Sequence, residues 1–207
     1  ESAELFSSLT GIPIGDHFQH EVLNAVGETA TLEEVIPDRE EIEKRIEQAT
    51  DPSGEAPVLV VASDGAHLPT RPKAPRKVKR GAGCYQEAKG FRLYLVDPQE
   101  RIIQIASWHQ IQDAKQFDKD LEVVADRIPK DKVRIALLGD GSDWLWTAMT
   151  RNFPHGRQVL DFYHCSEHIH LVAKAQYGDG TLNSQQWAEA TLVRLSSSYL
   201  QHKFHPI

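Results

Sequence analysis

Two aspartates, each at the end of an apolar run, are the residues of this chain best suited to chemistry. Asp64 ends the run PVLVVASD at residues 57–64, and Asp140 follows the run at residues 133–138; both are followed by glycine. Short apolar runs bounded by turn residues are typical of buried strands. A single Asp-Gly is most often only a turn. Two of them, at the ends of strands that are distant in the sequence, favour a shared site.

Carboxylates at neighbouring strand ends form a site of hard oxygen ligands, which suits Mg²⁺ or Mn²⁺. A pair of such ions can hold the attacking and leaving oxygens of an in-line phosphoryl transfer, so the protein needs no covalent nucleophile. We therefore predict that Asp64 and Asp140 bind Mg²⁺ or Mn²⁺ and are catalytic. Such a site usually has a third acid, and Glu167 and Glu189 are candidates by their order along the chain.

A cluster of cations follows directly after Asp64, in a segment at residues 67–83 that contains three prolines and is expected to be a loop. The whole chain has a formal net charge of −7, so bulk charge does not indicate nucleic-acid binding and a local basic patch would have to supply it. Contacts from Lys and Arg to phosphate dominate the affinity of proteins for nucleic acids. We predict DNA contact, with an ordinary solvated surface as the alternative, for Arg71, Lys73, Arg76, Lys77, Lys79 and Arg80.

A polar cluster, His164-Cys165-Ser166-Glu167-His168, follows the apolar run at residues 159–163. Its Cys-x-x-His spacing could bind zinc, but the chain lacks a second ligand pair at the usual spacing. Packing and hydrogen bonding near the acids is the favoured interpretation. Tyr163 and Trp144 are expected in the core, and Asp161 could point to either face.

The order of the expected elements is strand, strand, strand, helix, strand, helix, strand, helix. Residues 57–64, 90–97 and 101–108 predict an antiparallel meander. Residues 113–128 predict a helix whose inward positions include Phe117 and Leu121. The first and fourth strands can be neighbours in a mixed sheet, which would place Asp64 close to Asp140. The fold class predicted is α/β, with three antiparallel strands, then parallel strands, and flanking helices.

The chain of 207 residues is expected to contain an N-terminal helical region at residues 1–54, a catalytic domain at residues 55–176, and the start of a helical insertion or C-terminal helix at residues 177–207. No apolar run reaches the ~18–20 residues of a membrane span, so no membrane partner is expected. Two cysteines form no disulfide framework, which favours the cytoplasm. The chain starts without Met, and we expect a fragment of a longer protein.

Four pieces of the chain, in this order, resemble the DDE transposases of bacterial insertion sequences: ASDGAHLPTR (62–71), QEAKG (86–90), LLGDGSDWLW (137–146) and VLDFYHCSEHI (159–169). The similarity extends over about residues 57–174. It implies a ribonuclease-H-like catalytic fold in which Asp64 and Asp140 match the first two catalytic acids. Cys165 and His168 match the Cys-x-x-His motif of Mutator-like and related transposases, which is thought to organise the site or the transposon end.

The resemblance further implies Mg²⁺ or Mn²⁺ as cofactor, transposon ends and target DNA as partners, and a possible homo-oligomer. In this family the third acid often lies beyond an inserted helical region, and residues 187–200 are placed where such an insertion would begin. We therefore do not assign catalysis to Glu189, and without a third acid the fragment would bind metal poorly and not cut DNA alone. The alternatives are a non-catalytic DNA-binding or assembly module and another ribonuclease-H-like nuclease.

Overall fold

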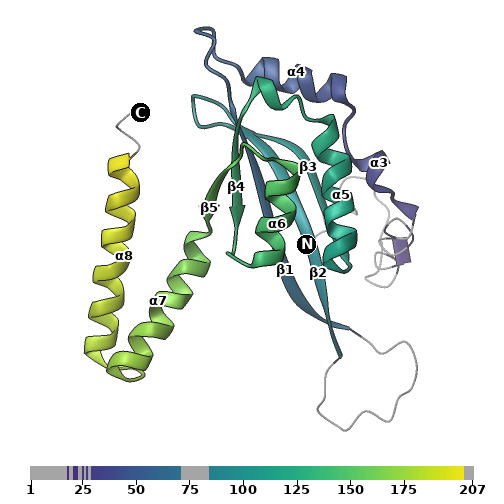
Figure 1. Ribbon diagram of the computed structural model, residues 1–207. Coiled ribbons are helices and arrows are strands. Elements are labelled where there is room, and N and C mark those ends of the chain that lie inside the picture. Colours follow the sequence, from purple (N-terminus) through teal and green to yellow (C-terminus); the bar gives the residue numbers. More distant parts are fainter. Residues whose placement is uncertain are drawn as a thin grey trace, which may run out of the picture.

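A five-stranded mixed sheet forms the centre of the molecule (Figure 1). The computed structural model describes residues 18, 21, 22, 25, 27, 29–70 and 84–202. The strand order is β3-β2-β1-β4-β5. Strands β1 (Val58–Thr70), β2 (Cys84–Val96) and β3 (Ile102–Ile111) are antiparallel neighbours, whereas β4 (Arg134–Gly139) runs parallel to β1 and β5 (Arg157–Leu160) runs parallel to β4. The predicted α/β class and its mixed sheet are confirmed.

One face of the sheet is covered by α5 (Ala114–Arg127) and α6 (Asp143–Asn152), which lie side by side (Figure 1). Asp113 caps α5 by accepting a hydrogen bond from Gln116 N at 2.8 Å. The 3.6-residue period then brings Phe117 and Leu121 to the face of the helix that is fully buried. Phe117 packs edge-on against Trp144 of α6, with ring centroids 5.2 Å apart. The inward positions predicted for this helix are confirmed.

The N-terminal helices share this core. Residues of α3 (Leu32–Val35) and α4 (Arg39–Ala49), including Ile42 and Ile46, are buried in the same cluster as the sheet. Arg127 at the end of α5 donates to Ile36 O at 2.8 Å, and Arg45 donates to Gln104 O at 2.8 Å. The described part of the N-terminal region therefore packs directly against the sheet and α5.

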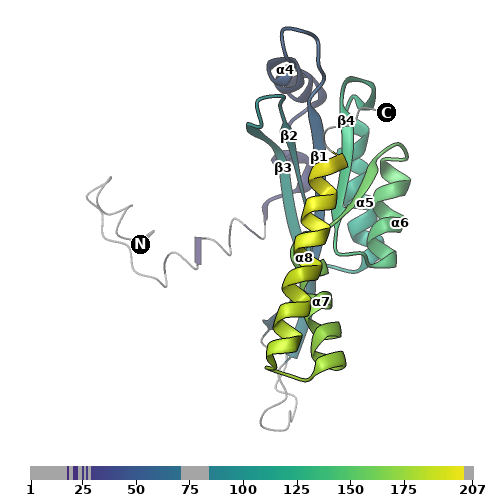
Figure 2. The ribbon, with the colours of Figure 1, turned by 90° about the vertical axis from the view of Figure 1, so that its left-hand side faces the viewer.

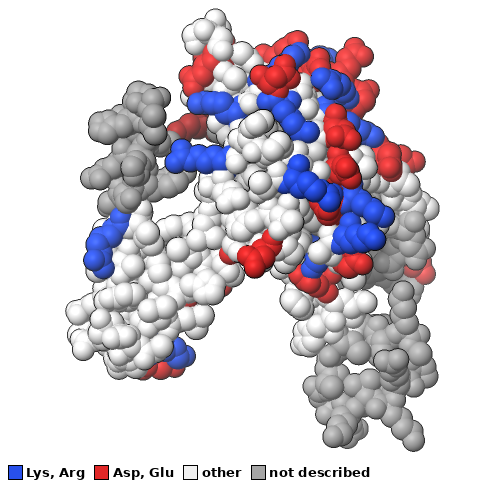
Figure 3. Space-filling model, viewed as in Figure 1, with Lys and Arg blue, Asp and Glu red and all other residues white. Residues whose placement is uncertain are grey.

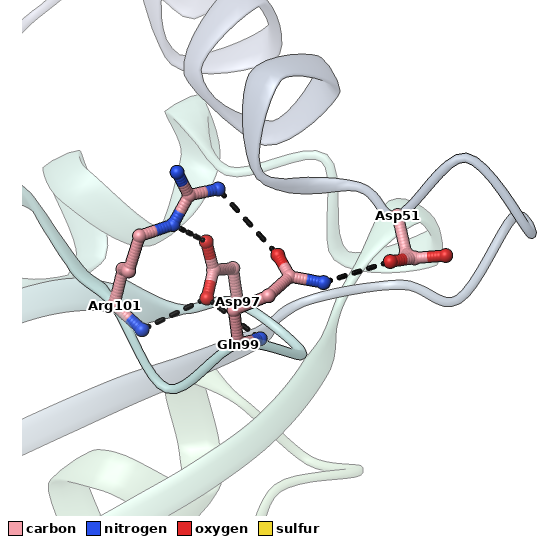
Figure 4. Close-up of polar contacts among 4 residues, drawn as sticks. All are labelled: Asp51, Asp97, Gln99 and Arg101. Atoms are coloured by element: carbon pink, nitrogen blue, oxygen red, sulfur yellow. Dashed lines mark hydrogen bonds and ion pairs between the residues drawn. The ribbon is translucent and has the colours of Figure 1, made fainter.

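The turn between β2 and β3 is held by Asp97, which is 3% exposed (Figure 4). Its carboxylate accepts hydrogen bonds from Gln99 N at 2.9 Å, from Arg101 N at 2.8 Å and from Arg101 Nε at 2.6 Å. Burial by itself would raise the pKa of Asp97, but the hydrogen bonds and charge of Arg101 outweigh it and lower this pKa from its usual 3.8. Gln99 Nε2 also donates to Asp51 Oδ2 at 2.8 Å, which ties the turn to the connection between α4 and β1.

Several expected strand boundaries are wrong. Strand β2 begins at Cys84 instead of Gly90, and β3 continues to Ile111 instead of ending at Trp108. Strand β1 does not end at Asp64 but continues to Thr70, because His67 and Pro69 pair with residues of β2 in an unbroken antiparallel ladder. Residues 67–70 of the expected loop therefore belong to β1, and residues 71–83 lie outside the described residues. The last strand does not reach Tyr163; β5 ends at Leu160 because Asp161 caps the following helix.

Two long helices, α7 (Phe162–Tyr177) and α8 (Leu182–His202), form a hairpin on the side of β4 and β5 away from α5 and α6 (Figure 1). Figure 2 shows α8 in front of the strands. Gly178 and Gly180 make the turn with φ of 91° and 69°, values that favour glycine. Figure 3 shows a hollow between the hairpin and the rest of the molecule, and few charged side chains on this side of the hairpin.

None of the helices in the described ranges is long and apolar enough to cross a membrane.

Candidate active site

Asp64 in β1 and Asp140, the residue that follows the parallel neighbour β4, line one cavity of about 460 Å³. The pairing of β1 with β4 ends at Ala62 and Leu138, and each aspartate comes two residues later. Because side chains alternate along a strand, each aspartate lies on the same face as the last paired residue of its strand. This face is opposite to the one that α5 and α6 cover. The juxtaposition expected from the strand order is therefore present.

The backbone corner around Asp140 depends on two glycines. A Cβ on Gly139 would come within 2.7 Å of Leu145 Cδ2, so the missing side chain lets α6 pack closely on the end of β4. Gly141 has φ of 97°, which side-chain-bearing residues rarely adopt. Together they let the chain leave the strand and start α6 within three residues. Asp140 is thereby held in the lining of the cavity.

Local hydrogen bonds orient one oxygen of each carboxylate. Asp140 Oδ1 accepts from Ser142 N at 2.9 Å and from Ser142 Oγ at 2.8 Å. Asp64 Oδ1 accepts from Gly65 N at 2.7 Å. Within the described ranges the second oxygen of each aspartate has no protein partner. These oxygens are the ones available to a cation or a solvent molecule.

Helix α7 supplies a second wall of the cavity, with Asp161, Tyr163, His164 and Glu167. Asp161 caps this helix by accepting from His164 N at 3.0 Å. Asp161 directly follows β5, as Asp140 directly follows β4. With the end of β5 placed correctly, the expectation that carboxylates after parallel strands share a site would have included Asp161. Four carboxylates and the single cation Arg92 line the cavity, which makes it a strongly acidic surface.

His109 also lines the cavity and was not expected from the sequence. It lies in β3 beside Gly90 of β2, which in turn pairs with Asp64 of β1. A Cβ on Gly90 would overlap the His109 ring and would approach Trp108 O to 2.6 Å. The absent side chain at Gly90 therefore leaves room for an imidazole beside the aspartates.

The two candidates for a third acid differ in position. Glu167 lines the cavity with Asp64 and Asp140, whereas Glu189 is exposed on α8 and is not part of its lining. Tyr163 was expected in the core, but it is 80% exposed and lines the cavity because α7 begins one residue before it. Trp144 packs against the core as expected.

The Cys-x-x-His pair does not line the cavity. Cys165 is a half-buried free thiol and His168 is exposed on α7. His168 instead contacts His164, with 3.1 Å between their Nε2 atoms. The basic residues Arg71, Lys73, Arg76, Lys77, Lys79 and Arg80 all lie outside the described residues, so DNA contact there stays a prediction.

The donor atoms around the cavity suit a hard cation only in part. Carboxylate oxygens are the ligands that Mg²⁺ and Mn²⁺ prefer, and Mg²⁺ is commonly held by one or two carboxylates with water and substrate phosphate completing its shell. Among residues 29–70 and 84–202, no group of three or more His, Cys, Asp or Glu side chains is close enough together to hold an ion. The described residues therefore form no complete ion site, and a cation here would need further ligands from water or a substrate.

No protein-family model matches the chain, and a search of curated proteins finds no match to it either.

Proposed function

We propose that this chain is the catalytic region of a DDE-type transposase that cleaves and transfers DNA strands at transposon ends. The observation that carries the proposal is the shared cavity of Asp64 and Asp140, reached from two adjacent parallel strands. The strand order β3-β2-β1-β4-β5, with antiparallel strands on one side and parallel strands on the other, is compatible with a ribonuclease-H-like fold.

The chemistry follows from the oxygen ligands. Mg²⁺ or Mn²⁺ bound by the two aspartates would lower the pKa of an attacking water or 3′-hydroxyl and offset charge on the phosphoryl group. The free oxygens of Asp64 and Asp140 would hold the cation, while Ser142 and Gly65 keep each carboxylate in one orientation. His109, Arg92 and Tyr163 line the same cavity.

The acidity of the cavity fits this proposal better than DNA binding alone. Four carboxylates facing one arginine would repel phosphate unless cations occupy the site. A surface that only bound DNA would be expected to carry the opposite charge here. Asp161 and Glu167 both share the cavity lining with the two aspartates, so they are the two carboxylates placed to complete the set.

A second candidate is a non-catalytic DNA-binding or assembly module of the same fold. It is favoured by one observation: the described residues contain no group of three or more ligating side chains close enough to hold an ion. In a non-catalytic module, Asp64 and Asp140 would bind no catalytic ion. If the protein does cut DNA, the site would need a further carboxylate from outside the described residues.

Nicking of DNA in Mn²⁺ by the full-length protein tests the proposal. Asp64→Asn and Asp140→Asn each replace a ligand oxygen with an amide of nearly equal size, and nicking is expected to fall to background. Asp143→Asn is the matched control, because Asp143 is exposed in the first turn of α6 and does not line the cavity. Nicking by either site variant at the wild-type rate would contradict the enzymatic assignment and leave the DNA-binding module.

A further inference from the structure

Two imidazole rings on α7 converge on one another. His164 and His168 are one helical turn apart, and side chains at this spacing lie on the same face of a helix. Their Nε2 atoms are 3.1 Å apart, with ring centroids 4.7 Å apart and ring planes at 77°. His164 is half-buried in the wall of the cavity and His168 is exposed. Within the described ranges neither ring is engaged by a carboxylate or carbonyl.

The separation of the two nitrogens is what a bound metal ion requires. An ion about 2.0–2.1 Å from two imidazole nitrogens sets them about 2.9 Å apart at a right angle and about 3.3 Å apart at a tetrahedral angle. The observed 3.1 Å lies between these limits. Without an ion, one ring must donate the proton that the other accepts. With an ion, both Nε2 atoms are unprotonated and each neutral ring carries its proton on Nδ1.

We propose that His164 and His168 chelate a divalent transition metal ion of the zinc type. Imidazole is a preferred ligand of Zn²⁺, Ni²⁺ and Cu²⁺, whereas the carboxylates of the cavity prefer Mg²⁺ or Mn²⁺. The two kinds of ion would therefore be sorted between neighbouring sites. The ligand pair differs from the Cys-x-x-His pair considered from the sequence, because the structure brings His164, not Cys165, to His168.

The remaining coordination positions would be filled by water or a ligand from another molecule, since no third ligating side chain in residues 29–70 and 84–202 joins the pair. A chelate across one turn fixes the first two turns of α7. Those turns carry Tyr163 and Glu167 into the cavity and start at the Asp161 cap. The metal would thus stiffen one wall of the candidate active site without taking part in its chemistry.

Calorimetric titration of the untagged protein with Zn²⁺, with the ¹⁵N shifts of the imidazoles followed by NMR, tests the inference. Zn²⁺ is expected to shift the resonances of His164 and His168, and His164→Gln or His168→Gln should each weaken binding by about tenfold or more. His168 is exposed, so its replacement leaves the packing intact. His170→Gln is the matched control, being an exposed histidine on the same helix that does not touch the pair.

The Asp64→Asn, Asp140→Asn double variant separates this inference from the proposed function. Zinc binding should persist in that variant, because its ligands are not the aspartates. Zinc affinity unchanged by both histidine substitutions, or no zinc-induced shift of either imidazole in the wild type, would overturn the inference and leave a hydrogen-bonded histidine pair. Neither result depends on whether the protein cuts DNA.

Discussion

Asp64 and Gly90 lie directly opposite one another in the antiparallel ladder of β1 and β2. The aspartate faces a position with no side chain, and the His109 ring from β3 occupies the space that a Cβ there would fill. Both Asp64 and His109 line the same cavity. Gly90, which has no side chain, therefore decides how closely the His109 ring approaches Asp64.

Gly90→Ala is expected to lower the free energy of unfolding by about 1–3 kcal/mol, because the added Cβ must displace the His109 ring and the backbone at Trp108. Chemical denaturation measures the change, and the NMR shift of the His109 ring reports its displacement. Gly27→Ala is the control, since a Cβ there meets nothing within 4 Å. Equal stability of Gly90→Ala and the wild type would show that the strands accommodate a side chain at this position.

The ion pair between buried Lys89 and partly exposed Glu87 gives a second prediction. Lys89 is 5% exposed and its Nζ lies 4.5 Å from the centre of the Trp144 ring. Glu87→Gln would leave a buried cation without its counter-charge, and we expect a loss of about 1–3 kcal/mol in the free energy of unfolding. Urea denaturation should show that adding Lys89→Met to Glu87→Gln restores part of this loss, because the uncompensated charge is gone. A double variant less stable than the single one would contradict the explanation.

The lowered pKa of Asp97 predicts that the free energy of unfolding decreases in acid. Its pKa is lowered in the folded protein from the usual 3.8, so the stabilisation it provides is fully present above that value. The stabilisation is lost as the pH falls through the lowered pKa of the folded state. Asp97→Asn should therefore destabilise the protein at neutral pH and flatten the decline of stability below about pH 4.

Equilibrium denaturation at a series of pH values checks this. Asp131→Asn, at an exposed position, is the control and should leave the profile as in the wild type. An acid decline in Asp97→Asn as steep as in the wild type would assign the effect to other carboxylates. The first of these to test would be Asp51, whose pKa is lowered by hydrogen bonds from Ser53 and Gln99.

The basic segment that follows β1 gives a prediction about DNA. Replacing Arg76, Lys77, Lys79 and Arg80 with Gln should weaken DNA binding, and the plot of log affinity against log salt should flatten by about 0.9 for each phosphate that the protein no longer neutralises. Gel-shift titrations at several salt concentrations measure this slope. Lys115→Gln with Lys119→Gln, both exposed on α5, is the matched control. A slope that does not change would make the segment an ordinary solvated surface.

The sequence was sufficient for the elements whose pattern is local. The apolar runs before Asp64 and Asp140 are strands, and the period of Phe117 and Leu121 is that of a helix packed on a sheet. The pairing of β1 with β4 was also predictable, because a strand that follows a helical crossover commonly pairs in parallel with the first strand of the meander. These features depend on residues within a few positions of one another or on general rules of chain connection.

One kind of error occurs where distant residues decide the local structure, and another where an unexpected helix cap decides it. Cross-strand pairing, not the intrinsic preference of Pro69, extends β1 to Thr70. The hydrogen bond from His164 N to the Asp161 side chain ends the last strand early and exposes Tyr163.

What the sequence alone determined is that Asp64 and Asp140 follow apolar strand segments, and that alternation puts each on one face of its strand. Only the tertiary structure decided which other residues share their cavity, because His109, Arg92 and Glu167 come from separate elements. The physical reason is that period and propensity act along the chain, whereas a cavity is set by the register between strands and by where a helix begins. A shift of one residue in strand register would send Arg92 or His109 to the opposite face of the sheet. A shift of one residue in the start of α7 would turn Glu167 by about 100° around the helix axis.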